Sequence, residues 1–348
     1  MIPRSVRAFG VFVAAWRLCA TDPEAITEAA QATALAQTGK FDAAIQHYQK
    51  AIRLDPHLPG IYLNLGLAYF KSNRLQEAAA AFEKAVAAAP SGFQARTLLG
   101  LSYYGSGRYD VAAKQLKVAA GVQPDNLELR FRLAQSYLWS GQYPQALEEF
   151  RFLLTKNPDS APVHMLMGEV LDAANHVEPA TAEFEAAVKS SASEPEAHFG
   201  LGYLYWKQQR YQDASREFQV ELASQPQHRQ SLVYLGDAEM HLGAGKSAEG
   251  HLRKALVLDK NNRLAHLDLG IVLADGGDSV AAIEHFREAI RLDPSKPDGH
   301  YRLGRLLRSL GRDPEAESEF AKVKNLATES QPEPLVKLAD RPHPKTAP

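Results

Sequence analysis

Four of the twelve histidines stand at a regular spacing that suggests a metal site. His164, His198, His266 and His300 follow one another at multiples of 34 residues. Ligands of one metal ion must converge to within ~2 Å of it, whereas equivalent positions of stacked helical units lie ~8–10 Å apart. The chain has no HExxH segment and a single cysteine, Cys19. We therefore expect these histidines to pack inside the fold, and we predict no metal and no other cofactor.

A second segment, GAGKSAEG at residues 243–250, contains GKS, which resembles the end of a phosphate-binding loop. Such a loop needs a glycine five residues before Gly245, where the chain has Met240, and it needs a preceding strand. The GxSxG and GxGxxG segments that mark hydrolases and dinucleotide-binding proteins do not occur. The sequence therefore predicts no catalytic residues and a protein that is not an enzyme.

Arginines recur among leucines at residues 301–312, in a pattern that resembles a helix built to hold phosphates. The chain has 39 Lys and Arg residues against 41 Asp and Glu residues, a net charge of -2, whereas nucleic-acid-binding proteins usually carry a basic excess. We therefore predict no nucleic-acid partner. We expect a soluble end of the fold, in which Asp298 pairs with Arg302 four residues later. Arg302, Arg305 and Arg308 remain a secondary candidate contact for an acidic tail of a partner protein.

These residues belong to a pattern that repeats every 34 residues. Glycine returns at one position of seven repeats: Gly66, Gly100, Gly168, Gly202, Gly236, Gly270 and Gly304. A second position is alanine throughout, from Ala44 to Ala316, and the fourth residue after it is always tyrosine, phenylalanine or leucine. One position requires a small side chain and the other a large apolar one, which predicts two closely packed helices. One such pair cannot bury its apolar face alone, whereas nine stacked pairs form a continuous core.

The ends of the two helices are marked in each repeat. Apolar residues within each half follow helical spacing, as at Leu65, Ala68 and Tyr69. Residues that accept a left-handed backbone are expected at the turn between the helices: Gly39, Asn73, Gly107, Gly141, Asn175, Gln209, Gly243, Gly277 and Gly311. Proline follows the second helix in most repeats, where it stops the chain. The pattern predicts helix, tight turn, helix and proline turn.

These positions resemble the tetratricopeptide repeat family. The resemblance covers residues 25 to about 328, with repeats that start at residues 25, 59, 93, 127, 161, 195, 229, 263 and 297. It implies an all-α solenoid, a right-handed superhelix whose first helices line a concave groove. Glu239 and Glu221 depart from the family pattern, because they replace an aromatic residue and an alanine. Ala192, Lys260 and Thr328 replace the closing proline, and we expect local loosening at these places.

The resemblance also indicates which side chains face the groove, at positions two, five, six, nine, twelve and thirteen of each repeat. The candidate partner-binding residues are Phe70, Tyr104, Phe131, Trp139, Phe199, Tyr203, Trp206, Tyr234 and Met240. Aromatic anchors of this kind contribute disproportionately to binding. At positions five and nine, packing against a neighbouring helix is an equally good interpretation, whereas the aromatic residues at positions twelve and thirteen favour binding. Acidic residues, including Asp237 and Asp268, would suit a ligand with a basic stretch beside an apolar one.

Two ligand modes known in the family do not fit. The carboxylate clamp for chaperone tails needs lysine, asparagine and arginine at set positions, where the first three repeats have Ala29, Thr33, Asn64, Gln94 and Leu98. Only Asn64 agrees. An asparagine ladder at position six is also absent, since that position holds residues as different as Leu98, Arg132 and Tyr234.

Residues 1–24 form a leader before the repeats, and residues 329–348 a polar, proline-rich tail. In the leader, Arg4 and Arg7 precede an apolar run, an arrangement that resembles an export signal over residues 1–20. Arg17 interrupts the run, and an uncleaved cytoplasmic N-terminus is the alternative. A cleaved signal would place the protein in the periplasm or outside the cell. No apolar run approaches the ~20 residues that span a bilayer.

The sequence therefore predicts a non-enzymatic protein–protein interaction scaffold that holds a peptide or helical segment of a partner in its groove. If the leader is an export signal, bacterial envelope assembly or secretion is the setting. The alternative is a regulatory or substrate-presenting subunit of a separately encoded transferase or secretion machine.

Overall fold

The structure, a computed structural model, describes residues 22–329 of the chain. These residues fall into two compact units, 22–158 and 159–329, and each unit is described by itself. The predicted export signal and most of the predicted tail lie outside the described residues. None of the described helices is both long and apolar enough to cross a membrane.

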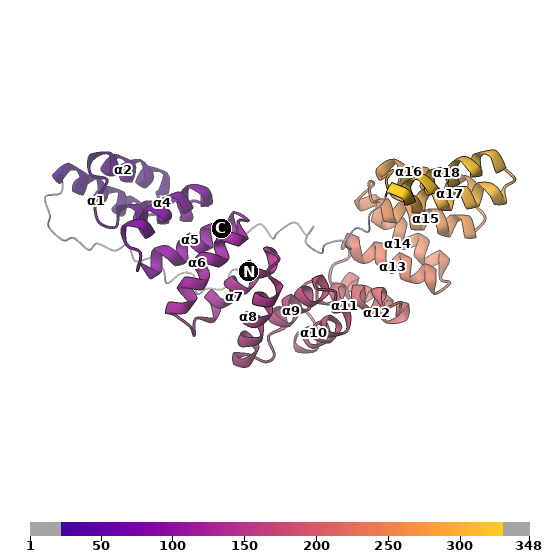
Figure 1. The fold of residues 1–348 in the computed structure, drawn as a ribbon, viewed down its shortest axis with the longest axis horizontal. Coiled ribbons are helices and arrows are strands. Elements are labelled where there is room, and N and C mark those ends of the chain that lie inside the picture. Colours follow the sequence, from indigo (N-terminus) through magenta and orange to yellow (C-terminus); the bar gives the residue numbers. More distant parts are fainter. Residues whose placement is uncertain (1–21, 330–348) are drawn as a thin grey trace. The chain divides into compact units, whose positions relative to one another are not determined.

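The described residues form eighteen helices and no strand. Unit 1 contains α1 (Pro23–Gln37), α2 (Phe41–Leu54), α3 (Ile61–Lys71), α4 (Leu75–Ala88), α5 (Phe93–Gly105), α6 (Tyr109–Val122), α7 (Leu127–Trp139) and α8 (Tyr143–Lys156). Unit 2 contains α9 (Ala161–Ala173), α10 (Val177–Ser190), α11 (Ala197–Lys207), α12 (Tyr211–Ser224), α13 (Arg229–His241), α14 (Gly245–Leu258), α15 (Arg263–Asp275), α16 (Ser279–Leu292), α17 (Pro297–Ser309) and α18 (Asp313–Glu329). Within each unit every helix packs against the next one in the chain (Figure 1). The predicted all-α solenoid of helix pairs is confirmed.

The glycine series lets the two helices of a repeat approach each other. A Cβ atom at Gly66 would lie 2.5 Å from the ring of Phe82, which is fully buried. The same relation holds for Gly202 and the ring of Phe218, at 2.8 Å. Any larger residue would force these rings out of place, because packed interiors have no spare volume. The predicted pairing of a small with a large residue is confirmed.

The nine residues between paired helices all have a positive φ, from 59° at Asn73 to 88° at Gly277. This left-handed backbone ends the first helix, and glycine adopts it without steric cost. The GAGKSAEG segment is one of these turns, because Gly243 has φ 76° and α14 begins at Gly245.

Helix pairs are also joined by polar contacts between residues 19 apart. Such contacts link Glu28 and His47, Arg96 and Gln115, Arg130 and Glu149, His164 and Glu183, His198 and Glu217, His266 and His285, and His300 and Glu319. The four regularly spaced histidines therefore bind separate partners, each inside its own repeat, instead of converging on one point. No group of three or more metal-ligating side chains occurs among the described residues.

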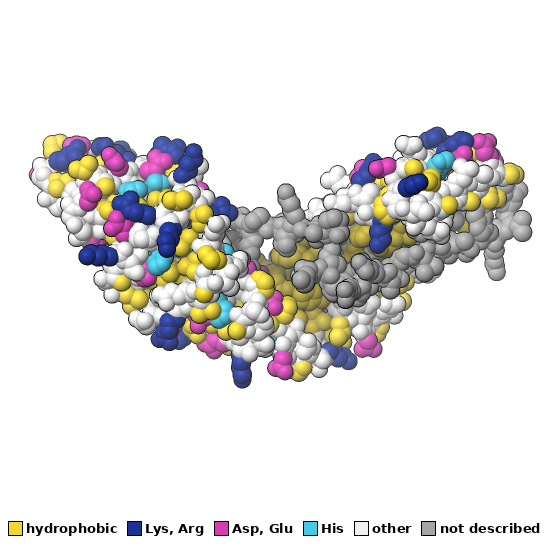
Figure 2. Space-filling view, turned by 180° about the vertical axis from the view of Figure 1, so that it is seen from behind, with side chains coloured by type: hydrophobic (Ala, Val, Ile, Leu, Met, Phe, Trp, Pro, Cys, Tyr) yellow, Lys and Arg dark blue, Asp and Glu magenta, His cyan; other side chains and the backbone are white. Residues whose placement is uncertain are grey.

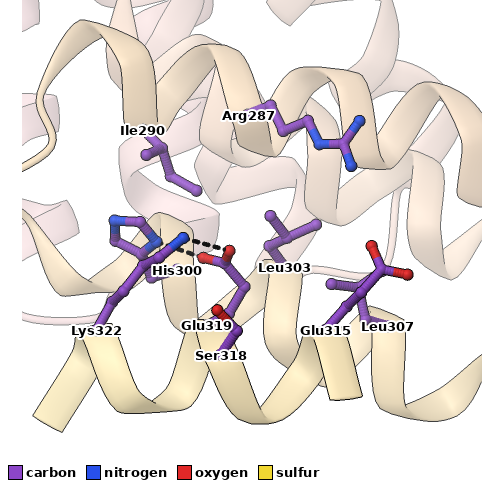
Figure 3. A pocket seen from close by; sticks show the side chains of 9 residues that line it. All are labelled: Arg287, Ile290, His300, Leu303, Leu307, Glu315, Ser318, Glu319 and Lys322. Atoms are coloured by element: carbon purple, nitrogen blue, oxygen red, sulfur yellow. Dashed lines mark hydrogen bonds and ion pairs between the residues drawn. The ribbon is translucent and has the colours of Figure 1, made fainter. Parts of the chain in front are cut away.

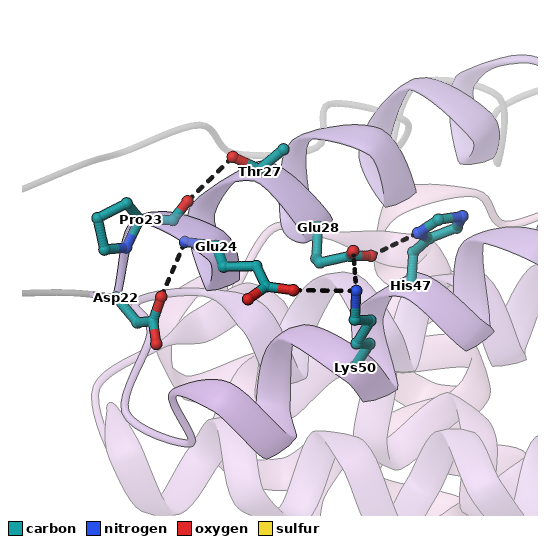
Figure 4. A network of polar contacts seen from close by, with 7 residues as sticks. All are labelled: Asp22, Pro23, Glu24, Thr27, Glu28, His47 and Lys50. Carbon is teal, nitrogen blue, oxygen red and sulfur yellow. Dashed lines mark hydrogen bonds and ion pairs between the residues drawn. The ribbon is translucent and has the colours of Figure 1, made fainter.

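The first repeat adds a lysine to this polar pair (Figure 4). Lys50 Nζ lies 2.6 Å from Glu28 Oε1 and 3.1 Å from Glu24 Oε1. Hydrogen bonds from Lys50 and His47 hold the pKa of the Glu28 carboxyl below its usual range. Asp22 accepts a hydrogen bond from the backbone N–H of Glu24 at 2.8 Å, which caps α1.

The two glutamates that depart from the family pattern do not loosen the fold. Glu239 is 5% exposed, and its Oε2 lies 2.7 Å from His251 Nδ1. Glu221 is 2% exposed, and it accepts hydrogen bonds from the Phe199 backbone N–H at 3.2 Å and from Gln225 Nε2 at 2.6 Å. The expected loosening is wrong at these two sites, since each buried carboxylate has a partner that offsets its burial.

Candidate functional site

The predicted groove residues divide between the units and differ in exposure. Those at positions twelve and thirteen are all partly exposed: Phe70, Tyr104 and Trp139 in unit 1, and Trp206 and Met240 in unit 2. Phe131 and Tyr234 are also partly exposed. Phe199 is 1% exposed and Tyr203 is 7% exposed. These two rings support the surface from below, and only the partly exposed residues are accessible to a partner.

Unit 1 presents a cluster of three aromatic rings. Tyr104 on α5, Tyr109 on α6 and Trp139 on α7 lie with ring centroids 5.0 to 5.7 Å apart. Edge-to-face and tilted arrangements at this distance are favourable beyond the area they bury. The rings therefore hold one another in fixed orientations.

Arg132 and Gln135, both on α7, complete the unit 1 cluster. The Tyr104 hydroxyl donates to Gln135 Oε1 at 2.8 Å, and Arg132 Nη1 donates to the same oxygen at 3.2 Å. The Arg132 guanidinium carbon lies 5.4 Å from the centre of the Tyr104 ring, a cation–π distance. Burial raises the pKa of Tyr104 to about 12, so the hydroxyl stays a donor near neutral pH. We call Tyr104, Tyr109, Arg132, Gln135 and Trp139 the unit 1 cluster.

Unit 2 carries a corresponding cluster 102 residues, or three repeats, later in the chain. The unit 2 cluster consists of Trp206, Tyr211, Tyr234, Asp237 and His241. The positions correspond as Tyr104 to Trp206, Tyr109 to Tyr211, Arg132 to Tyr234, Gln135 to Asp237, and Trp139 to His241. Here too the residue of position twelve donates to position nine of the next repeat, since Trp206 Nε1 donates to Asp237 Oδ2. Tyr211 and His241 stack with ring centroids 4.3 Å apart and planes inclined by 9°.

Buried rings support the unit 2 cluster from below. Tyr203 stacks on Trp206 with ring centroids 6.0 Å apart, and it meets Tyr234 edge-on at 5.4 Å. Phe218, which is fully buried, lies 6.0 Å from both Phe199 and Tyr234. Trp206 therefore rests on a continuous aromatic layer.

The unit 2 cluster contains one carboxyl group, that of Asp237, and the carboxyl group of Asp268 interacts with it. Asp268 on α15 is 7% exposed, and it makes no hydrogen bond or ion pair with any residue from 22 to 329. Burial, and then the negative charge of Asp237, raise the pKa of the Asp268 carboxyl well above its usual range. The charges of Asp237 and Asp268 also help to raise the pKa of Tyr234 to about 12, after the larger effect of burial. Asp237, Asp268 and Tyr234 therefore share one local environment.

Next to this cluster, an ion pair between Lys207 and Asp172 lies beside an aromatic ring. Lys207 Nζ lies 2.5 Å from Asp172 Oδ1 and 5.8 Å from the centre of the Tyr203 ring. Both side chains of this ion pair are largely buried, with 12% and 7% of their surface exposed. A carboxylate beside an aromatic face thus binds a lysine of the chain itself.

The three arginines of the last repeat have different surroundings. Arg308 pairs with Glu317 and lies 4.5 Å from the centre of the Phe320 ring, and Arg305 lies 5.9 Å from the centre of the Tyr301 ring. Arg302 is partly buried. The predicted pair of Arg302 with Asp298 does not form. Asp298 instead accepts two hydrogen bonds from Arg263, at 2.7 and 3.1 Å, because a planar guanidinium fits a carboxylate with two parallel bonds.

A cavity of about 400 Å³ lies between α16, α17 and α18 (Figure 3). Figure 3 shows that His300 and Lys322 both point to Glu319. Their hydrogen bonds, which act against burial, keep the pKa of that carboxyl below its usual range. Three of the polar side chains that line this cavity are thus bound to one another. Elsewhere, on the face shown in Figure 2, Lys and Arg side chains are interspersed with Asp and Glu.

Sequence reasoning missed Tyr109, Tyr211, Gln135 and His241. The first two begin second helices, which the assignment of groove positions did not include. A spacing of 31 residues could have revealed Gln135. It joins Tyr104 to Gln135 and, three repeats later, Trp206 to Asp237.

Comparisons with known proteins agree with this architecture. A family model described as TPR repeat matches residues 32–73, and models described as tetratricopeptide repeat match residues 59–91, 103–170, 165–222, 201–263 and 267–329. A stretch of 61 residues is 41% identical to the small glutamine-rich tetratricopeptide repeat-containing protein 2 of Mycosarcoma maydis. That stretch is 18% of this chain and 17% of the relative.

Two solved structures show the same fold. The chain is 20% identical to PilF of Pseudomonas aeruginosa, over 59% of this chain and 93% of that one, with a TM-score of 0.51. It is 17% identical to a chain of the APC/C hetero-tetramer Cut9-Hcn1, over 80% of this chain and 54% of that one, with a TM-score of 0.54. The family models together cover most of the sequence, and they show that the chain belongs to the tetratricopeptide repeat family.

Proposed function

We propose that the protein is a non-enzymatic adaptor that binds a peptide or helical segment of a partner protein against its aromatic clusters. The observation that carries this proposal is the state of Trp139 and Trp206. Each indole is partly exposed, and each is packed between neighbouring rings. Large side chains that are already ordered before binding lose little conformational entropy when a partner covers them.

The surroundings of these rings support the same proposal. Trp and Tyr residues that lie in desolvated surfaces with satisfied polar ends are the residues that most often dominate binding energy. Here Tyr104 donates to Gln135, and Trp206 donates to Asp237. Such a ring presents an apolar face to a ligand without leaving a polar atom unpaired.

Site-specific photo-crosslinking tests the proposal. A photoreactive phenylalanine analogue placed at Trp139 or at Trp206 is expected to crosslink a partner from native extract. The matched control is Phe152, an aromatic residue of a second helix, which lies under Arg130 at 4.0 Å and outside both clusters. The same analogue at Phe152 is expected to give no such product.

Mass spectrometry of the crosslinked peptides identifies the bound segment. Trp139→Ala and Trp206→Ala are expected to lower recovery of that partner at least tenfold, while Phe152→Ala preserves it. Circular dichroism establishes that each variant is folded. Equal crosslinking at Phe152, or full recovery of the partner by the folded Trp139→Ala Trp206→Ala variant, would contradict the proposal.

The bacterial envelope is the setting we propose if the leader is an export signal. The prediction over residues 1–20 is tested by N-terminal sequencing of the protein purified from its own cells. A first residue near Thr21 is expected, and an intact leader would move the protein to the cytoplasm.

A further inference from the structure

We propose that Asp237 and Asp268, together with the rings of Trp206 and Tyr234, bind the positively charged side chain of a lysine or arginine in the partner segment. This inference rests on the proposed function and deepens it, because it states which chemistry the unit 2 cluster selects. Three observations carry it.

The first observation is the arginine that the unit 1 cluster contains and the unit 2 cluster lacks. In the unit 1 cluster Arg132 lies over Tyr104 and donates to Gln135. At the position of Arg132 the unit 2 cluster has Tyr234, and at the position of Gln135 it has Asp237. The unit 1 cluster therefore contains an arginine, whereas the unit 2 cluster has a carboxyl group and no arginine among its five residues.

The second observation is the state of Asp268. More than nine-tenths of this residue is buried, and its carboxyl has no hydrogen bond or ion pair with the described part of the chain. Its oxygens are not among the fully buried side-chain atoms of the described residues that lack a partner, so a ligand can reach them. Asp237 accepts one hydrogen bond at Oδ2, from Trp206, and His241 Nε2 lies 3.7 Å from the same oxygen. Both carboxyl groups thus retain acceptor capacity that a ligand can use.

Besides burial, which is the largest cause of its raised pKa, four charged groups act on the Asp268 carboxyl. Asp237 on α13 and Asp298 on α17 raise its pKa, and Arg263 on α15 and Arg302 on α17 lower it. The guanidinium of Arg263 is bound on both branches by Asp298. Arg302 remains, and it forms no ion pair with Asp268. An entering cation therefore competes with Arg302 for Asp268 and with His241 for Asp237.

The third observation is the lysine that unit 2 already binds in this way. Lys207 extends over the ring of Tyr203 to the carboxylate of Asp172. The aliphatic part of a lysine or arginine can cover apolar surface while its charge reaches a carboxylate. Trp206 and Tyr234, with ring centroids 5.0 Å apart, together with Met240 on the same helix as Tyr234, offer such a surface beside Asp237.

Binding of a cation should release a proton. Burial and the charge of Asp237 favour the protonated form of the Asp268 carboxyl, and a bound cation favours the ionised form. The affinity for a cation is therefore expected to rise with pH through the range in which Asp268 ionises. A neutral ligand of the same shape is expected to show no such dependence.

The inference can be tested on the full chain with N-acetyl-arginine amide as the probe and N-acetyl-citrulline amide as its neutral isostere. The readout is the indole N–H resonance of Trp206, followed by nuclear magnetic resonance, with the indole of Trp139 as the internal control. The arginine probe is expected to shift the Trp206 resonance in a saturable way and to leave Trp139 unchanged. The citrulline probe is expected to shift neither.

Variants assign the effect to the two carboxyl groups. Asp237→Asn and Asp268→Asn are each expected to weaken binding of the arginine probe about tenfold, the effect of one charge-assisted hydrogen bond. Asp275→Asn removes one exposed acidic charge from the end of α15 and should leave binding unchanged. Arg302→Gln removes the cation that competes for Asp268 and should strengthen binding of the arginine probe. Thermal melting shows which variants are folded.

Two results would overturn the inference. One is an equal response to the arginine and citrulline probes, and the other is unchanged probe binding by folded Asp237→Asn and Asp268→Asn. These outcomes are separate from a failure of the proposed function. If Trp139 and Trp206 crosslink no partner while the arginine probe binds as described, the adaptor proposal fails and the cation site stands.

Discussion

In unit 1, Arg132 lies over the ring of Tyr104 and shares Gln135 with its hydroxyl. Three repeats later, in unit 2, Tyr234 occupies the place of that arginine, and an aspartate replaces the glutamine. The backbone register is the same, since positions twelve and nine meet at the same spacing in both clusters. The repeat therefore determines which positions meet, and the side chains at those positions determine the charge of the ligand that fits.

The buried residues that support the two clusters also differ. Under the unit 2 cluster lies Phe218, and the corresponding residue in unit 1 is Leu116. Both are fully buried. Phe218 contacts two further rings, Phe199 and Tyr234, so the unit 2 surface depends on aromatic packing that continues into the core.

The largest effect on stability is expected from truncating these buried supporting residues. Phe218→Ala should lower the free energy of unfolding by about 3–5 kcal/mol, and Leu116→Ala by an amount nearer the lower end of about 2–5 kcal/mol. Phe218→Ala leaves the larger cavity because two supporting rings lose their contact. Urea denaturation measures both losses. An equal loss for the two variants would mean that the aromatic layer adds nothing to the stability of unit 2.

The buried carboxyl of Asp268 should make unit 2 sensitive to pH. Its raised pKa means that the folded chain binds this proton more tightly than the unfolded chain. Stability from this group is therefore present below the ordinary aspartate pKa of about 3.9 and is lost as the pH rises. Asp268→Asn should raise the free energy of unfolding by about 1–3 kcal/mol at pH 7, and the gain should vanish in acid.

Thermal melts of the wild type and Asp268→Asn between pH 3 and pH 8 measure this difference. The control is Asp275→Asn, whose side chain is exposed. A constant difference between Asp268→Asn and the wild type across this range would contradict the role assigned to ionisation.

An exchange between the clusters should move the cation preference from one unit to the other. Tyr234→Arg gives unit 2 the cation of unit 1, and it should weaken binding of the arginine probe at least tenfold, which is about 1.4 kcal/mol. The reverse change, Arg132→Tyr with Gln135→Asp, should make the Trp139 resonance respond to the probe. Nuclear magnetic resonance titration follows both indoles. Persistent binding by Tyr234→Arg would show that the site lies elsewhere.

The smallest effect is expected at the turns that lead into the clusters. Gly107 precedes Tyr109 and Gln209 precedes Tyr211 by the same two residues, with φ of 76° and 60°. Gln209→Gly removes the strain of a left-handed glutamine and should stabilise unit 2 by about 0.5–1 kcal/mol. Gly107→Gln should destabilise unit 1 by a similar amount. Chemical denaturation midpoints provide the measurement, and a loss of stability in Gln209→Gly would contradict this account.

Helices, turns and close helix contacts could be predicted because they depend on residues near in sequence or on a strict period. Gly66 and Phe82, for example, stand 16 residues apart in adjacent helices of one repeat. Exposure at the site was less predictable. Phe131 and Phe199 share position five, yet Phe131 is partly exposed and Phe199 is 1% exposed. Phe199 is covered by neighbouring rings, among them Phe218 and Tyr234. A rule that assigns exposure from the repeat position alone does not include such neighbours.

Polar partners were the least predictable feature. Asp298 had a suitable arginine within its own helix, but Arg263 of the preceding repeat reaches it with two hydrogen bonds. Glu239 departs from the repeat pattern, and its contact with His251 on the next helix becomes apparent only in the folded chain. Such choices depend on the geometry of several side chains at once, which the spacing of residues along one helix does not determine.

The contact between a core glycine and the large apolar residue 16 positions later has an evolutionary consequence. Because Gly202 and Phe218, or Gly66 and Phe82, meet inside one repeat, each of the seven repeats with this glycine carries both residues of the contact. Gene recombination in steps of 34 codons would leave these contacts complete. An exchange between segments three repeats apart would replace one cluster with the other, so a lineage could change the charge of its ligand while the glycine contacts of each repeat stay complete.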